Sequence, residues 1–179
     1  MADAMLDLET LGVTNNAVIL TVGCVKFDPF NTDEPHSPLY FAIDINEQQD
    51  KGRIVDNGTV EWWGKQSQAA QDAAMIEEGR VSMEDAAAQI SKFMVGVNKV
   101  WAQGPLFDIA MLEDFYAMVG KTVPWQFYNI RDSRTVFDMG DDSAKRGNGD
   151  AHNALADAFC QAQAVQQIYK QLGVVKKTK

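Results

Sequence analysis

The sequence predicts an α/β domain built on a mixed central sheet, with three antiparallel strands followed by parallel strands and helices on both faces. Segments 2–7 and 17–27 are together rich in Met, Val, Ile and Leu and flank a turn-prone stretch, so both are predicted strands. A third strand is predicted at 39–45, after a breaker segment with three prolines. Short connections favour antiparallel pairing of these strands, and later alternation of strands with helices favours parallel pairing.

Helices are predicted in the middle of the chain, where apolar residues recur at helical spacing. The predicted segments are 60–65, 68–77 and the residues that follow Ser82, which resembles an N-cap. A short strand at 99–102 and a Gly-Pro break then precede a helix at 106–119, whose apolar residues form one stripe.

The last third of the chain is predicted to hold a strand, a short helix, a loop and a long helix. The strand covers 125–130 and the short helix 133–139. The polar segment 140–150 contains three glycines and is expected to form a mobile loop. The final helix is predicted over 151–172, with Asp150 as its N-cap.

Length and composition indicate one domain. The 179 residues are 46% hydrophobic, which excludes disorder, and two cysteines exclude a disulfide scaffold. We expect a domain at 1–173 and a basic tail at 174–179 that frays from it. The longest mainly apolar run, 17–25, is far shorter than the roughly 20 residues that span a bilayer. A cytoplasmic protein without a membrane partner is therefore expected.

The net charge limits the kinds of partner. Lys and Arg number 16 against 25 Asp and Glu, which gives a formal charge of −9. A surface of this sign repels nucleic acid on average and favours a cationic partner or a metal ion. Any nucleic-acid substrate is therefore expected to be held at an end or as a short single strand, without a long basic groove.

Acidic residues at three places in the chain are candidates for a metal site. Asp7 and Glu9 stand two apart on a strand, so they share a face and can hold a hard cation; two solvated acids are the alternative. Asp108 opens a helix after a strand, where ligands collect in such sheets, or it simply caps that helix. His152 precedes Asp157 by five residues; a helix-opening histidine with a surface acid is the alternative.

In this order, these residues resemble the DEDDh branch of the DnaQ-like 3′-to-5′ exonucleases, which have a ribonuclease H-like fold. The stretch at 5–12, M-L-D-L-E-T-L-G, looks like the first motif of that family, G-P-L-F-D-I-A-M-L at 104–112 like the second, and H-N-A-L-A-D at 152–157 like the third. Stretches 60–67 and 131–135 look like the small phage and bacterial DexA-type exonucleases and their exoribonuclease relatives.

The resemblance implies an enzyme that hydrolyses phosphodiester bonds at the 3′ end of single-stranded DNA or RNA and releases nucleoside 5′-monophosphates. Clustered carboxylates raise one another's pKa unless cations neutralise them, and all-oxygen ligands favour Mg²⁺ or Mn²⁺ over zinc. Two such ions are implied, with His152 as the general base that takes a proton from the attacking water. The implied metal ligands are Asp7, Glu9, Asp108 and Asp157.

Residues beside the motifs are predicted to contact the substrate. Leu8, Thr10 and Leu11 adjoin the first acids, where backbone N–H groups and an apolar wedge could hold the terminal nucleotide. Phe107 precedes Asp108 and is a second stacking candidate. A place in the core is the alternative for Leu8 and Phe107.

Basic residues near the motifs are candidates for binding phosphate. Arg131 and Arg134 are assigned to a phosphate or a partner chain, and an ion-paired turn is the alternative. Lys145 and Arg146 lie in the loop that precedes the third motif and are placed to meet a phosphate backbone. The adjacent tryptophans at 62–63 point about 100° apart on a helix, so one is expected inside and the other at the groove or an interface.

Two alternatives to the exonuclease stay open: a ribonuclease H-like endonuclease, and a non-catalytic nucleic-acid or nucleotide-binding module of the same fold. The complete set of four acids and His152 argues against the module. The expected partner is single-stranded nucleic acid or the 3′ end of a short oligonucleotide. Contact with a 2′-hydroxyl leaves no spacing signature, so DNA and RNA are not distinguished. A homodimer is possible, since twofold oligomers are common.

Overall fold

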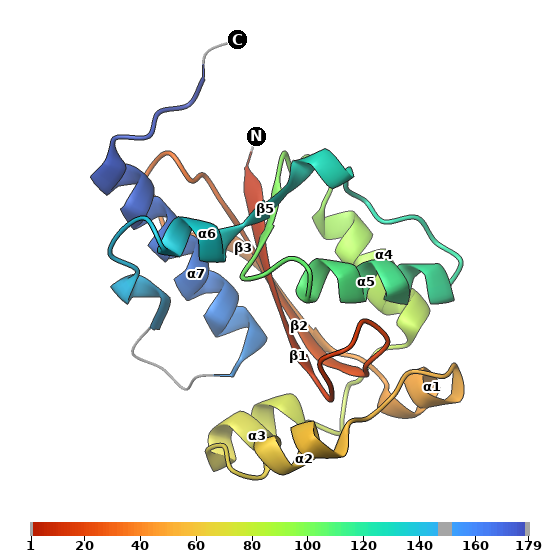
Figure 1. Ribbon diagram of the computed structural model, residues 1–179. Helices are drawn as coiled ribbons and strands as arrows, with labels where there is room; N and C mark the ends of the chain where they lie inside the picture. The colour runs from red at the N-terminus through yellow and green to blue at the C-terminus, as the bar shows by residue number, and fades with distance from the viewer. Residues whose placement is uncertain (1, 147–151, 178–179) are drawn as a thin grey trace.

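The computed structural model describes residues 2–146 and 152–177, which form a five-stranded sheet in the order β3-β2-β1-β4-β5 (Figure 1). Strands β1 to β3 are antiparallel, whereas β4 runs parallel to β1 and β5 parallel to β4. This arrangement confirms the predicted fold class. The strands are β1 (Asp3–Thr10), β2 (Ile19–Phe27), β3 (His36–Ala42), β4 (Val100–Ala102) and β5 (Ile130–Asp132).

Helices cover both faces of the sheet. In Figure 1, α4 and α5 lie on one side of the strands and α6 and α7 on the other, while α2 and α3 lie beyond the carboxyl end of β1. The helices are α1 (Ile45–Asp50), α2 (Asn57–Trp63), α3 (Gln68–Ala74), α4 (Met83–Phe93), α5 (Asp108–Met118), α6 (Ser133–Phe137) and α7 (Ala154–Leu172), with 3₁₀ turns η1 (Phe127–Asn129) and η2 (Ser143–Arg146). None of the described helices is long and apolar enough to cross a membrane.

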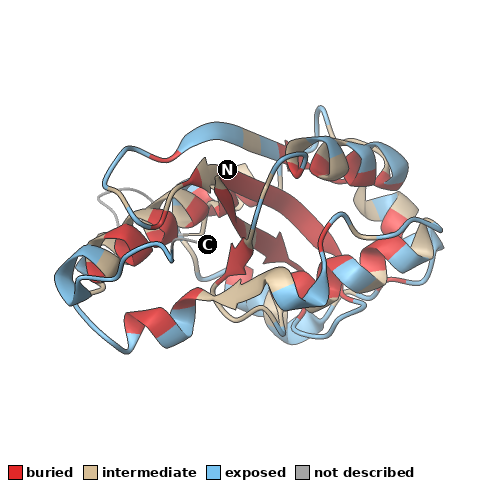
Figure 2. Ribbon diagram, turned by 90° about the horizontal axis from the view of Figure 1, so that it is seen from above, coloured by how far each residue is buried: buried red, intermediate tan, exposed pale blue. Residues whose placement is uncertain are grey.

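Side-chain alternation along β1 divides the core into two layers. Leu6 and Leu8 pack with α4 and α5, whereas Met5 packs with Trp101 and α7. Strands β1, β2 and β4 are almost wholly buried, whereas β3 is mostly exposed and β5 half-buried, at the two edges of the sheet. Figure 2 shows the helices buried along the side that meets the sheet. Because side chains alternate, the odd-numbered Asp7 and Glu9 fall on the side of the sheet that carries α7.

The structure corrects two element assignments. Helix α1 was not predicted: it is short and polar, and it depends on a tertiary contact in which the buried Gln48 amide bonds both backbone groups of Ile19. The predicted strand at 125–130 is wrong, because residues 127–129 form η1 and β5 starts at Ile130. Phe127 and Tyr128 are 81% and 61% exposed, so the aromatic content that suggested a strand does not reflect burial.

Several element boundaries also differ from the prediction. Strand β3 begins at His36 and ends at Ala42, three residues earlier at each end than predicted. Asn153 caps α7 through a bond from the Ala156 N–H, in place of the predicted Asp150, which lies outside the described residues. The predicted loop 140–150 contains η2, and its residues from 147 onward lie outside the described part.

Candidate active site

Strand β1 places two carboxylates side by side at its carboxyl end. Asp7 pairs in register with Gly23 of β2, and Glu9 pairs with Thr21. The Asp7 Oδ1 accepts a hydrogen bond from the Gln161 Nε2 of α7 at 2.8 Å. Both acids are thus held on the α7 side of the sheet, as the two-residue spacing predicts.

The first residue of α5 brings a third carboxylate to β1. The Asp108 Oδ1 accepts a hydrogen bond from the backbone N–H of Leu8 at 3.2 Å, between the two acids of the strand. Phe107 occupies the N-cap position and makes no side-chain cap bond. The helix-capping alternative for Asp108 is therefore wrong, and its carboxylate is directed at the strand end.

The first turn of α7 and the residues just before it bring Asp157 and His152 to the carboxyl end of β1. The Asp157 Oδ2 accepts a hydrogen bond from the His152 backbone N–H at 3.0 Å, and His152 has a positive φ of 69°. One ligand atom from each of Glu9, His152 and Asp157 lies within 4.8 Å of the others, so these three side chains can hold a metal ion. Residues 143 and 148 positions after Glu9 thus join it in one cluster.

Gly23 allows this approach of α7 to the sheet. A Cβ at Gly23 would overlap the backbone of Ala154 and Leu155, at the first turn of α7. The helix start therefore sits directly on the residue that pairs with Asp7. A glycine inside a buried strand indicates a close backbone approach, and this signal was present in the sequence but was not used.

Burial raises the pKa of each acid in the cluster, and repulsion from neighbouring acids adds to the rise for Asp7 and Glu9. Desolvation is the largest cause for Asp7, followed by the charges of Asp108 and Glu9, and its pKa lies well above the ordinary value. Desolvation and the charge of Asp157 raise the pKa of Glu9 to about 8. Desolvation also raises the pKa of Asp108 to about 7 and the pKa of Asp157. Bound cations would replace the protons that these groups otherwise retain.

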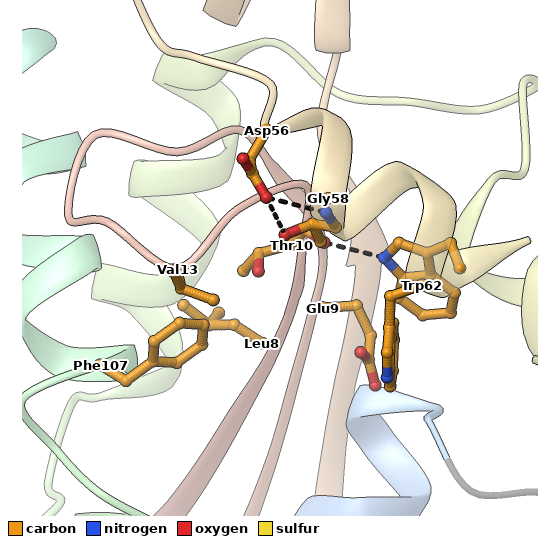
Figure 3. A pocket seen from close by; sticks show the side chains of 10 residues that line it. Leu8, Glu9, Thr10, Val13, Asp56, Gly58, Trp62 and Phe107 are labelled. Carbon is orange, nitrogen blue, oxygen red and sulfur yellow. Dashed lines mark hydrogen bonds between the residues drawn. The ribbon is translucent and has the colours of Figure 1, made fainter. Parts of the chain in front are cut away.

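A cavity of about 400 Å³ opens beside Glu9. Figure 3 shows aromatic and aliphatic side chains on its walls. The Trp63 Nε1 donates a hydrogen bond to the backbone oxygen of Thr10 at 2.9 Å. Three of the predicted substrate contacts, Leu8, Thr10 and Phe107, line it. The full lining is Leu8, Glu9, Thr10, Val13, Asp56, Gly58, Thr59, Trp62, Trp63 and Phe107.

Leu11 is not part of this lining. Its side chain is buried in a small core cluster with Val18, Leu20 and Trp63. The bulge between Glu9 and Thr10 shifts the register at the end of β1, and Leu11 turns toward α2 and α3. Leu11 therefore supports the wall of the cavity from behind.

The two tryptophans have separate places. Trp63 is buried, whereas Trp62 is partly exposed and lines the cavity. The ring of Trp62 also packs edge-to-face on the imidazole of His152, with centroids 4.8 Å apart. One indole is therefore inside and the other joins the site, as the adjacent positions predict.

The basic residues predicted to bind phosphate lie at different distances from the site. The charge of Arg134 lowers the pKa of Asp108, and its guanidinium donates to the Gln103 carbonyl at 3.2 Å, so it lies near the acids. Arg131 donates instead to the Tyr128 and Ile130 carbonyls. Lys145 pairs with Asp142 and lies over the ring of Phe137, 5.1 Å from its centroid. Neither Arg131 nor Lys145 lines the cavity. The Arg146 side chain lies outside the described residues.

Comparisons with known proteins agree with this arrangement. The model of the 3′-5′ exoribonuclease Rv2179c-like domain matches residues 2–169. The exodeoxyribonuclease of Enterobacteria phage T4 is 26% identical, over 75% of this chain and 70% of that protein.

Solved structures share the fold at low sequence identity. E. coli exonuclease I in complex with a dA16 oligonucleotide has a TM-score of 0.68 and 17% identity, over 96% of this chain and 41% of that one, so the chain spans about two-fifths of that protein. The nuclease domain of 3′hExo, a DEDDh family member bound to rAMP, has a TM-score of 0.60 and 13% identity, over 95% and 92%. The chain belongs to the 3′-5′ exoribonuclease Rv2179c-like domain family, which confirms the predicted 3′-to-5′ exonuclease class for this domain.

Proposed function

We propose that this domain is a metal-dependent exonuclease that removes nucleoside 5′-monophosphates from the 3′ end of single-stranded DNA or RNA. The observation that carries the proposal is the convergence of Asp7, Glu9, Asp108, His152 and Asp157 beside a cavity large enough for a nucleotide. The family name points to RNA, whereas the phage relative is named for DNA, so both substrates are included.

The donor set fits hard divalent cations. The four carboxylates are buried or half-buried and close enough to raise one another's pKa, so they are suited to cations rather than to solvent. Two Mg²⁺ or Mn²⁺ ions would be held by these acids, and when bound they would supply an activated water and stabilise the leaving oxygen. Oxygen ligands favour these ions over zinc.

His152 is proposed to accept the proton from the attacking water. Its position ahead of α7 sets its ring between the acids and the wall of the cavity, and contacts with Trp62 and Asp157 hold it there. Imidazole is the side chain that most often acts as a general base, and it can accept a proton at a ring nitrogen and release it to solvent.

The cavity is proposed to hold the terminal nucleotide. Trp62 and Phe107 supply aromatic surface and Leu8 an aliphatic one. In Figure 3, Phe107 and Leu8 lie on one side of the opening and Trp62 on the other. Stacking on such surfaces tolerates any base, so little sequence preference is expected. E. coli exonuclease I was solved with single-stranded dA16, which supports a single strand as the form of the substrate.

Degradation of end-labelled oligonucleotides tests the proposal. Matched DNA and RNA strands, each labelled at the 5′ end, are incubated with Mg²⁺ or Mn²⁺, with EDTA as the control. A ladder shortened from the 3′ end with release of mononucleotides supports the exonuclease. Larger internal fragments would favour an endonuclease, and no metal-dependent shortening of either strand would favour a non-catalytic binding module.

The proposal also covers the domain bounds, the location in the cell and the oligomeric state. We include a single domain at 1–173, a tail at 174–179 and a cytoplasmic location. Cys24 and Cys160 are free, with Cys24 buried, as expected for a reducing compartment. A homodimer is tested by light scattering coupled to size-exclusion chromatography.

A further inference from the structure

Gln161 connects α7 directly to Asp7. It lies four residues after Asp157, so both side chains project from the same face of the helix toward the sheet. The Gln161 side chain is 5% exposed, and its Nε2 donates to Asp7 Oδ1 at 2.8 Å. A glutamine on a helix is usually solvated, so burial of this amide against a carboxylate needs a reason.

The carbonyl oxygen of the same amide lacks a partner. Gln161 Oε1 is buried and has no hydrogen-bond partner among the described residues. Leaving such an atom unpaired is unfavourable. The burial of this amide is therefore not explained by its carbonyl oxygen, and the bond that its Nε2 donates to Asp7 is the interaction that it supplies.

We propose that Gln161 is a positioning residue that fixes the Asp7 carboxylate for divalent cation binding. The inference rests on the proposed function. The amide N–H engages one lone pair of Oδ1. The carboxylate keeps further lone pairs that can bind a cation. A neutral donor can hold the ionised carboxylate without competing with the cation for charge.

The same helix contains a matched control. Gln166 is also buried, at 4% exposure, and its Nε2 donates to the Asp28 and Asp33 carbonyls at 3.0 and 2.9 Å. These bonds hold the loop that follows β2, and none of them reaches an acid of the site. Gln161→Met and Gln166→Met therefore remove similar buried amides, one at the site and one away from it.

Mn²⁺ binding and turnover are measured for both variants and for the wild type. We expect Gln161→Met to bind Mn²⁺ about 10–100-fold more weakly in a calorimetric titration and to lose a similar factor in kcat, with KM for a short oligonucleotide little changed. Gln166→Met is expected to lower Tm and leave Mn²⁺ affinity and kcat unchanged.

Wild-type Mn²⁺ affinity in a folded Gln161→Met protein would overturn the inference, as would equal losses in both glutamine variants. If Gln161→Met does not fold, Gln161→Asn, whose amide is one methylene too short for Asp7, replaces it with the same expectation. The Mn²⁺ titration also separates the two proposals. A wild type that binds Mn²⁺ without shortening oligonucleotides would refute the exonuclease, and the titration of the variants would still decide the role of Gln161.

Discussion

The two faces of the central sheet differ in use, although the same strands supply both. The face under α4 and α5 is apolar along β1, with Leu6 and Leu8 in the core. The face under α7 is apolar at Met5 and becomes acidic at Asp7 and Glu9, where the pKa values are raised. The face under α4 and α5 stabilises the fold. At the end of the face under α7, buried acids lower the stability of the fold and form the proposed catalytic site.

The largest expected effect comes from removing the acid at the centre of the α7 face. Asp7→Ala is expected to abolish mononucleotide release from a labelled oligonucleotide, because Asp7 lies between the other acids and the Gln161 amide. The loss should exceed the roughly 100-fold that removal of an outer hydrogen-bond partner costs. Retained turnover would contradict the assignment of this face to catalysis.

Removing the proposed base should have a smaller effect. His152→Ala is expected to lower kcat by about 10²–10⁴-fold, the usual contribution of a positioned general base. Mn²⁺ affinity should be nearly intact, since four carboxylates remain. A calorimetric titration in which the variant loses Mn²⁺ binding would indicate that His152 is a ligand instead.

The opposite face should respond in stability alone. Ile90→Ala, in the fully buried part of α4, is expected to lower the free energy of unfolding by about 2–5 kcal/mol. Because α4 contributes no side chain to the acidic cluster, kcat of the folded variant should match the wild type. Denaturant unfolding and single-turnover assays measure the two quantities, and a large fall in kcat would show that the faces are not independent.

The same division explains which parts of the site were predictable. The four acids of the site and His152 stand in short local sequence patterns. These patterns alone place them at the end of one strand and at the starts of two helices. Gln161 and Gly23 act only across the sheet, on Asp7 and on the first turn of α7. Their roles depend on which helix meets which strand, and this is tertiary information.

The elements of the fold were likewise predictable where the sequence pattern is local, and not where an element depends on tertiary contacts. Strands β1 and β2 and helices α4 and α7 have long apolar patterns, and their places in the chain were predicted. Helix α1 depends on the Asp44 cap and on Gln48, which bonds to β2, so short-range periodicity does not reveal it. The segment around Tyr128 has the composition of a strand but no partner face, and it forms a 3₁₀ turn before β5.

The last expected effect is a dependence of stability on pH that arises on the acidic face. Burial raises the pKa of Glu9 from 4.5 to about 8, so between these values the folded metal-free protein binds more protons than the unfolded chain. Stability should therefore be highest near pH 5 and should fall as the pH rises to 8, with Tm decreasing by about 2–4 °C for each kcal/mol lost.

Saturating Mg²⁺ should flatten this dependence, because the cation replaces the protons. Glu9→Gln should reduce the slope in the metal-free protein, since the amide does not titrate, whereas Ile90→Ala should lower Tm equally at every pH. Thermal unfolding from pH 5 to 8, with EDTA or Mg²⁺, measures all three proteins. A metal-free wild type that gains stability with rising pH would mean that these acids are ionised without a cation. The face under α7 would then differ from the face under α4 and α5 only in polarity, and not in stability.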